Sequence, residues 1–298
     1  MIRPRLSICM PAYKADRYLE ATLDSVRAQT FADWELILVE DGSHDRAEEI
    51  FKEFAAKVSQ PTRFLRHEKN QGLPATRNTG IDLARSEWIV LLDSDDLWAP
   101  NHLADLVACA ERNPAADLVH SASVLFDSDT GKELEIRAPS PEVVADYPLS
   151  LFVGNYVVQP SSVMLKKSLW KKVGGFDPGF RYVEDREMWM RCARAGGKFA
   201  YTGANTCLYR KHATALTTHA GPMAIAAALV YDKAVAWEAI PKKVRLNYAS
   251  RSWTSAGRIV LREKPRDARK YFWKGVRYEF SFSRLAYWAT AAVLGIVK

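Results

Sequence analysis

Three carboxylates follow an apolar stretch in the segment LLDSDDLWAP, which covers residues 91–100. Asp93, Asp95 and Asp96 stand within four positions of one another. Carboxylates this close repel each other, and burying them unpaired costs free energy. A divalent cation would neutralise them, because such ions take carboxylate oxygens together with the phosphate oxygens of a substrate. The pattern predicts a cation and diphosphate site, with the acids strained or mobile in its absence.

Strand-like and helix-like patterns alternate over about the first 115 residues. The expected strands are 6–10, 34–39, 62–67 and 87–92, and the expected helices are 16–29, 45–58, 73–85 and 100–112. This alternation predicts an α/β fold, a doubly wound and mostly parallel sheet with helices on both faces.

Three of the expected strands end in polar or conformationally special residues. These ends are Pro11-Ala12-Tyr13, Glu40-Asp41-Gly42 and the acids from Asp93. Ligands of such sheets bind at the carboxyl ends of the strands. We therefore expect the three strand ends to converge, although they are far apart in the sequence.

The remainder of the chain changes character twice. Strands are expected at 118–126, 161–165 and 198–209, helices at 166–173 and 184–195, and a surface loop at 127–148. From Met223 the pattern is helical, with Pro241 and Pro265 separating three expected helices. We expect one domain over 1–220, in halves of about 1–115 and 116–220, and a helical extension over 221–298.

Net charge is distributed unevenly along the chain. The whole sequence carries +7, whereas residues 221–298 hold 15 Lys and Arg against 5 Asp and Glu, and the rest is slightly acidic. That argues against a body built to bind nucleic acid and for an extension that meets an anionic partner.

Targeting and redox features indicate a cytoplasmic protein. The start of the sequence lacks the apolar region of a leader peptide, and no run of 18 apolar residues occurs. The four cysteines are widely spaced without a CxxC pair, so we expect reduced thiols and no zinc site.

Six segments together resemble the family-2 inverting glycosyltransferases of the GT-A fold. They occur in order over residues 6 to about 217: LSICMPAYK, LILVEDGS, NQGLPATRNTGI, WIVLLDSDDLW, GGFDPGFRYVEDREMWMR and YRKHATALT. The resemblance implies a nucleotide-binding half and an acceptor-side half within 1–220. It also implies Mn²⁺ or Mg²⁺ as cofactor and transfer of a sugar, most simply from a UDP-sugar, to a glycan or lipid-linked acceptor in cell-surface polysaccharide synthesis.

The resemblance also assigns roles to individual residues. Asp185 matches the catalytic base, and Asp95 with His212 matches the metal site. The acceptor side is assigned to Glu184 and Arg186. Contacts to the donor nucleotide fall on a larger set: Pro11, Ala12, Tyr13, Asp41, Arg77 and Asp93.

Each assignment has a structural alternative. Asp41 before Gly42 is also typical of a turn, and the pair Glu184-Asp185 is also typical of a helix start. Asp96 is interpreted as a turn former, and Trp34, Trp98 and Trp189 as core residues. Relatives often carry two aspartates at 40–41 and Trp-Asp at 186–187, where this chain has Glu-Asp and Arg-Glu.

Two interpretations of residues 221–298 remain open. Aromatic residues interleaved with Lys and Arg suit contact with an anionic membrane surface at the inner face of the plasma membrane. A helical cap on the catalytic domain, with its basic face in water, explains the same pattern. Binding of single-stranded nucleic acid ranks below both, because no nucleic-acid fold signature is present.

Two other functions remain as alternatives to sugar transfer. A nucleotidyltransferase acting on a sugar phosphate would need a basic, glycine-rich loop after the first strand, where this chain has PAYKADRY. Neither GxGxxG nor GxxxxGK[ST] follows that strand, which disfavours dinucleotide and P-loop sites. The other alternative is a non-catalytic nucleotide-sugar-binding subunit, which the acids Asp93, Asp95 and Asp185 argue against.

Overall fold

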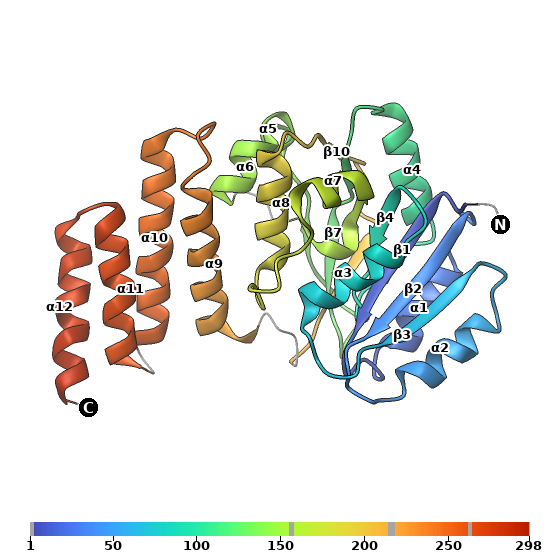
Figure 1. Ribbon diagram of the computed structural model, residues 1–298, viewed down its shortest axis with the longest axis horizontal. Coiled ribbons are helices and arrows are strands. Elements are labelled where there is room, and N and C mark those ends of the chain that lie inside the picture. Colours follow the sequence, from blue (N-terminus) through green and yellow to red (C-terminus); the bar gives the residue numbers. More distant parts are fainter. Residues whose placement is uncertain (1–2, 155–157, 214–217, 262–263, 298) are drawn as a thin grey trace. The chain divides into compact units, whose positions relative to one another are not determined.

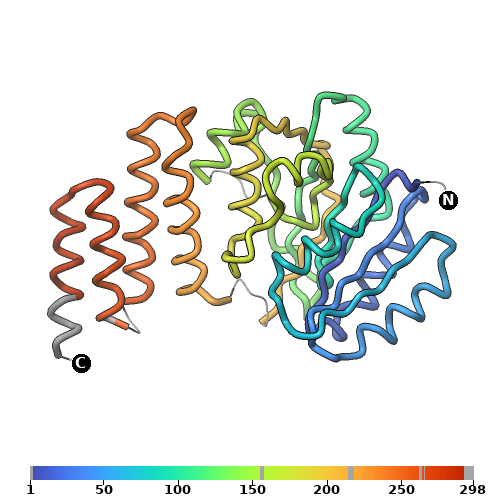
Figure 2. Tube along the Cα trace, viewed as in Figure 1, coloured from blue at the N-terminus to red at the C-terminus, as the bar shows by residue number. Residues whose placement is uncertain are grey.

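The computed structural model describes residues 3–154, 158–213, 218–261 and 264–297 (Figure 1), and Figure 2 traces the course of the chain. The chain divides into two compact units, Met1–His212 and Ala213–Lys298. The first unit holds two sheets and the second is helical (Figure 1).

The larger sheet of the first unit contains seven strands within the described residues. They are β1 (Leu6–Ala12), β2 (Trp34–Glu40), β3 (Thr62–Arg66), β4 (Trp88–Leu91), β6 (Leu118–His120), β9 (Val163–Lys166) and β10 (Phe199–Tyr201). Their order is β10-β6-β9-β4-β1-β2-β3, and β9 runs antiparallel to both of its neighbours. The predicted α/β fold with a mostly parallel sheet is confirmed.

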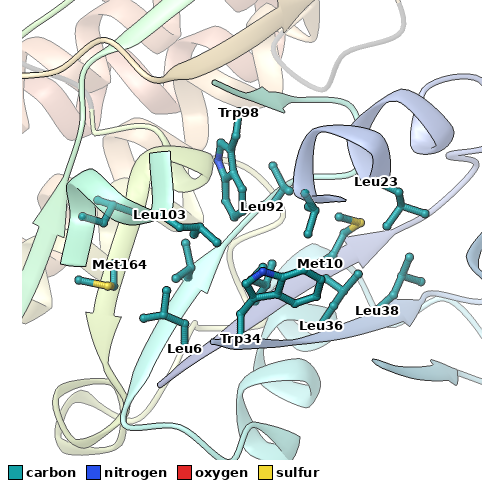
Figure 3. Close-up of a cluster of buried hydrophobic side chains, with 14 of the residues drawn as sticks. Leu6, Met10, Leu23, Trp34, Leu36, Leu38, Leu92, Trp98, Leu103 and Met164 are labelled. Atoms are coloured by element: carbon teal, nitrogen blue, oxygen red, sulfur yellow. The ribbon is translucent and has the colours of Figure 1, made fainter. Parts of the chain in front are cut away.

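Side chains of successive residues in the central strands point to opposite faces of this sheet. One face packs against α1 (Leu19–Arg27), α2 (Ala47–Ala55) and α4 (His102–Arg112), in a core that includes Trp34 and Trp98 (Figure 3). The opposite face lies against α3 (Leu73–Leu83), which comes close enough that a Cβ on Gly80 would lie 3.5 Å from Cys9 Cβ. Both faces of β1 and β2 are therefore buried, because successive side chains point alternately to the helices on one face and on the other. The tryptophans interpreted as core residues are buried, Trp189 included.

A second sheet lies beside the first in the same unit. Its order is β5-β11-β7-β8, and its strands are β5 (Leu97–Trp98), β7 (Ser123–Asp127), β8 (Glu133–Arg137) and β11 (Cys207–Lys211). The expected single strand 118–126 is wrong, because Ser121 and Ala122 bond to Ser162 and Ala204 and carry the chain from one sheet to the other.

The expected surface loop at 127–148 is also wrong. It contains β8, whose sequence ELEIR alternates with the strand period, and the short helices α5 (Pro141–Ala145) and α6 (Tyr147–Val153), which begins there. Ser140 and Asp146 cap these helices with their side chains. The other helices of the unit are a 3₁₀ turn (Pro160–Ser162), α7 (Lys167–Val173) and α8 (Glu184–Arg194).

The second unit contains four helices in its described residues rather than the three expected. They are α9 (Ala220–Ala234), α10 (Lys242–Leu261), α11 (Pro265–Tyr278) and α12 (Phe282–Val297). The break missed in the sequence lies at Glu279–Ser281, where Ser281 Oγ accepts the Arg284 N–H at 3.2 Å. None of the described helices is both long and apolar enough to cross a bilayer.

Gly42, at the end of β2, allows a close approach between two loops. Its φ is +72°, and a Cβ there would lie 2.8 Å from the backbone of Lys69. Gly131 has a similar φ of +69° but open space around it. We expect Gly131→Ala to cost about 1–2 kcal/mol from its left-handed backbone alone. Gly42→Ala should cost about 1–3 kcal/mol more, because backbone atoms must move.

Urea unfolding of the two variants checks this prediction. Equal destabilisation by both substitutions would show that the approach of the Lys69 loop to Gly42 contributes nothing beyond the dihedral angle.

Candidate active site

The register of the central strands brings the three polar strand ends together. β1 lies between β2 and β4, with Ala12 paired to Glu40 and Cys9 to Leu91. The Asp41 N–H donates to Ala12 O at 2.8 Å, and the Leu92 N–H donates to Cys9 O at 3.2 Å. The residues that follow these strands therefore share one edge of the sheet, as expected from the topology.

Arg77 joins two of the predicted site segments from inside the protein. Its side chain is 1% exposed, and its Nη2 donates to both oxygens of Asp93 at 2.7 and 2.9 Å. Its Nη1 donates to Glu184 Oε1 at 2.5 Å. The guanidinium also lies over the ring of Phe176. The predicted contact of Arg77 with a donor nucleotide stays a prediction; in the structure its charge is used by two carboxylates.

The same buried arginine carries an uncompensated polar atom. Nε of Arg77 has no hydrogen-bond partner among the described residues. Leaving a buried donor unsatisfied costs free energy, so this arrangement is not the one that stability alone would favour. The neighbouring carboxylates raise the pKa of Arg77 although burial opposes this, and the guanidinium stays charged.

The other two acids of the segment differ sharply in their environment. Asp95 has a side chain that is 38% exposed, and its Oδ2 lies 3.0 Å from Nε2 of His212. Asp96 is 1% exposed and accepts hydrogen bonds from Ser161 Oγ at 2.6 Å and from the Arg210 N–H at 3.0 Å. Asp96 thus ties β11 to this loop, which agrees with a structural role.

The expectation of strained or mobile acids in the absence of a cation did not include partners from the protein itself. Each acid has a protein partner: Arg77 for Asp93, His212 for Asp95, and Ser161 with Arg210 for Asp96. The sequence reasoning missed this because the partners come from segments far from the acids along the chain.

Asp41 is held by protein donors at the end of β2. Its Oδ1 accepts from His67 Nδ1 at 2.7 Å and from the Gln71 N–H at 2.9 Å, and its Oδ2 accepts from the Gly72 N–H at 2.8 Å. Burial alone would raise the pKa of Asp41, but these hydrogen bonds lower it below its ordinary value. The carboxylate is thereby fixed in its ionised form against the loop that precedes α3.

The residues at the end of β1 differ in how far they are exposed to solvent. Pro11 and Ala12 are buried within the strand. Tyr13, directly after it, is 48% exposed, and Lys14 Nζ lies over its ring. Tyr13 therefore offers a partly exposed ring directly after Ala12, whose carbonyl accepts the Asp41 N–H.

The pair Glu184-Asp185 opens α8. Burial raises the pKa of Glu184 to about 7, although its ion pair with Arg77 opposes this shift. Burial also raises the pKa of Asp185 above its ordinary value of 3.8, and its carboxylate accepts the Arg186 N–H at 2.7 Å. Glu184 therefore forms an ion pair with the buried Arg77, whereas Asp185 accepts a hydrogen bond from a backbone N–H.

The guanidinium of Arg186 reaches the end of α6. Its Nη2 lies 3.5 Å from Phe152 O, and a Cβ on Gly154 would come within 2.6 Å of the same nitrogen. The guanidinium therefore covers the carboxyl end of α6, where unpaired carbonyls favour a cation. Its predicted place on the acceptor side stays a prediction.

Backbone strain is found next to the predicted site residues. Among the described non-glycine residues, positive φ occurs at Lys14, His44 and Val183, at 52°, 55° and 58°. They stand beside Tyr13, in the turn after Asp41, and directly before Glu184. Such conformations cost about 1–3 kcal/mol each and cluster at functional sites. The β-branched Val183 is the most unfavourable case.

Three further residues were not foreseen as part of this site. His67 orients Asp41, Ser161 donates to Asp96 and accepts the Asp93 N–H, and Arg210 donates from Nε to Asp95 O at 2.7 Å. Arg210 lies in the segment YRKH, and His67 directly follows β3. Their positions at or near the ends of strands could have indicated that they belong to the site.

The residues at Asp95 fit a divalent cation that a substrate completes. Within the described residues no group of three or more His, Cys, Asp and Glu side chains stands together as a full ligand set. Asp95 and His212 provide two, and a cation held by one or two protein ligands plus phosphate oxygens is the usual arrangement for Mg²⁺. A carboxylate with an imidazole also suits Mn²⁺.

Comparison with known proteins gives one family. The model of glycosyl transferase family 2 matches residues 7–173. An uncharacterized glycosyltransferase of Methanocaldococcus jannaschii is 31% identical over 201 residues, 67% of this chain and 68% of that protein. TuaG of Bacillus subtilis, a glycosyltransferase whose name refers to teichuronic acid biosynthesis, is 26% identical over 69% of this chain and 78% of its own length.

Solved structures share the fold at low sequence identity. Staphylococcus aureus TarS 1-349 in complex with UDP-GlcNAc has a TM-score of 0.66 and 14% identity, over 96% of this chain and 79% of that one. The mannosyltransferase PcManGT from Pyrobaculum calidifontis, in complex with GDP-Man and Mn²⁺, has a TM-score of 0.62 and 16% identity, over 99% and 88%.

Replacing Arg77 should destabilise the first unit severely. Arg77→Met leaves Asp93 and Glu184 buried without their cation, a situation that costs about 3–5 kcal/mol. Urea unfolding of the full chain at neutral pH measures this loss. The matched control is Arg27→Met, since Arg27 pairs with Asp24 at 2.8 Å while 46% exposed, and should change stability by no more than about 0.5 kcal/mol. Similar effects of the two substitutions would contradict the buried link.

Proposed function

The chain belongs to glycosyl transferase family 2 and is a glycosyltransferase, and from that premise we propose a metal-dependent, inverting transfer of a sugar. The donor is a UDP-sugar, and the acceptor is a glycan or lipid-linked saccharide in cell-surface polysaccharide synthesis. Transfer takes place in the cytoplasm, with the chain peripheral to the inner face of the plasma membrane.

One observation carries this proposal: the buried Arg77 holds the acid segment and the start of α8 together. Its two ion pairs reach Asp93 beside the proposed metal ligand and Glu184 beside the proposed base. A transferase needs leaving group and attacking hydroxyl held in fixed geometry, because such positioning lowers the barrier by several kcal/mol. Arg77 supplies that connection from within the fold.

Asp185 is the proposed catalytic base. The acceptor hydroxyl attacks the anomeric carbon as the bond to the diphosphate breaks, and Asp185 takes the hydroxyl proton. Glu184 is less suited, because its carboxylate is bound to Arg77. General-base catalysis contributes about 10²–10⁴-fold in rate. Inversion follows from a single displacement on the face opposite the leaving group.

Asp95 and His212 are the proposed metal ligands. A divalent ion there would supply charge stabilisation of the leaving diphosphate. The chain itself prepares the position, because Arg210 fixes the Asp95 carbonyl and Asp96 holds the Arg210 backbone. The Mn²⁺ bound to PcManGT supports a divalent cation in this fold.

The donor nucleotide is placed at the ends of β1 and β2. The proposed donor to Asp41 is a ring N–H such as that of uracil, which Oδ2 would accept in addition to the Gly72 N–H; the Asp41 side chain is 4% exposed in the structure. Tyr13 provides a ring that is 48% exposed at the end of the neighbouring strand β1. The UDP-GlcNAc bound to TarS supports a uridine donor, and the name of TuaG supports a polysaccharide product.

A thermal-shift screen of nucleotide sugars with and without Mn²⁺ tests the donor and the metal together. A donor at 100 times its Kd should stabilise the native state by about 2.7 kcal/mol. Asp95→Asn should abolish both transfer and the Mn²⁺-dependent part of this shift while leaving the unliganded protein stable, because Asp95 is substantially exposed. Full transfer by Asp95→Asn would refute the proposed metal site.

Asp96→Asn is the matched comparison. The buried Asp96 carboxylate accepts hydrogen bonds from Ser161 Oγ and the Arg210 N–H, and the substitution replaces one accepting oxygen by an amide nitrogen. One of the two donors then loses its acceptor, so the free energy of unfolding should fall by about 1–3 kcal/mol. Loss of stability in Asp95→Asn and not in Asp96→Asn would reverse the roles given to the two acids.

The pH profile of kcat/KM tests Asp185. A base acts in its deprotonated form, and burial raises the pKa of Asp185 above 3.8. Activity should therefore fall as the pH drops through an inflection that lies above 3.8, before the protein unfolds. Asp185→Asn should remove transfer while retaining donor binding. Thermal melts at each pH separate the inflection from loss of fold, and a profile without an acid limb would count against a carboxylate base.

A further inference from the structure

The rotation of α11 is fixed by tight packing within the second unit. Phe272 is fully buried, and a Cβ on Gly257 of α10 would lie 2.7 Å from its ring. A Cβ on Gly275 would lie 2.8 Å from Thr254 Oγ1 and 3.0 Å from Ser250 O. These contacts leave α11 no freedom to turn, so its outward face is determined by the fold.

That outward face carries cations around one tryptophan. Arg266, Arg269, Lys270, Trp273 and Arg277 are exposed, and their spacing of three or four residues places them along one stripe of the helix. Trp273 is 48% exposed, and its ring lies 5.8 Å from that of Trp288 on α12. Such a stripe combines positive charge with an aromatic side chain suited to a polar–apolar boundary.

The turn between α11 and α12 follows this stripe in the chain and exposes two phenylalanines. Phe280 is 59% exposed and Phe282 82% exposed, and their rings pack edge to face at 5.4 Å. Of the large apolar side chains that the structure describes, Phe282 is exposed to the greatest extent. Neighbouring apolar rings that stay in water mark an interaction site more often than chance exposure.

We propose that the outward stripe of α11 and the Phe280–Phe282 turn, together the basic aromatic face, dock on the surface of an anionic lipid bilayer. From Lys264 to Arg284 the chain has seven Lys and Arg against two Asp and Glu. The cations pair with lipid phosphates, and the rings enter the boundary between headgroups and acyl chains. No helix needs to span the bilayer for this contact.

The inference deepens the membrane contact within the proposed function, and its test does not use sugar transfer. A protein that binds vesicles but lacks transferase activity refutes the proposed function alone. A transferase that does not bind vesicles refutes the docking face and the peripheral location, and leaves the proposed sugar transfer standing. A second copy of the chain is the competing occupant, and light scattering separates the two.

Vesicle sedimentation with the full chain tests the docking face. The probes are phosphatidylcholine vesicles with and without phosphatidylglycerol. We expect binding to the anionic vesicles that is released by salt, and weak binding to the neutral ones. Phe280→Ser/Phe282→Ser should weaken binding roughly tenfold or more, because the apolar rings contribute through their burial. Lys270→Gln/Arg277→Gln should weaken it by roughly fivefold per cation removed.

The control is Leu134→Ser/Ile136→Ser on β8. These side chains are similarly exposed, at 54% and 53%, but belong to the first unit. Binding by this variant should equal that of the unchanged protein. Three outcomes overturn the proposal: no binding to anionic vesicles, equal binding by the Phe280/Phe282 variant, or a dimer that this variant converts to monomers without any vesicle binding.

Discussion

A buried guanidinium between two carboxylates is the constraint on which the site depends. Arg77 is almost wholly excluded from water, so its charge must be compensated inside the protein, and Asp93 and Glu184 do so at its two terminal nitrogens. Removing one partner of such a group is far more costly than the net contribution of the pair. The arrangement therefore sets the relative position of the acid segment after β4 and the first turn of α8.

The parallel strands supply the frame around this link. Because β1 pairs with both β2 and β4, the residues after these strands meet at one edge of the sheet. The chain accepts unfavourable backbone angles at Lys14, His44 and Val183 in the same loops. Strain of this kind persists only where surrounding packing enforces it, which the buried strands and α3 provide.

The two units differ in the side chains that they expose. The first unit concentrates carboxylates and their partners at the strand ends. The second unit buries Phe272 and Trp253 between helices while leaving Trp273, Phe280 and Phe282 in water among cations. That contrast agrees with the charge distribution of the sequence, in which the excess of Lys and Arg lies after residue 221.

Much of the fold was predictable because its signals are local. Apolar runs marked β1, β2 and β4, and the order of strands and helices indicated a parallel sheet whose ends converge. Where the chain crosses between the sheets at Ser121 and Ala122, the residues HSAS separate two apolar runs. The strand prediction passed over this interruption, because all of these residues are buried in the structure. The end of α11 was missed because no proline marks it.

The residue types of the site were likewise evident in the sequence, but their partners were not. The acids at 93, 95 and 96 look alike along the chain. Only the folded structure distinguishes them by their partners. Asp93 pairs with Arg77, Asp95 lies at hydrogen-bond distance from His212, and Asp96 accepts hydrogen bonds from Ser161 and Arg210. The physical reason is that charge compensation acts through space: Glu184 and Arg77 are 107 residues apart and meet at hydrogen-bond distance. Sequence determined which groups are present, and tertiary packing decided which of them are paired and which remain accessible.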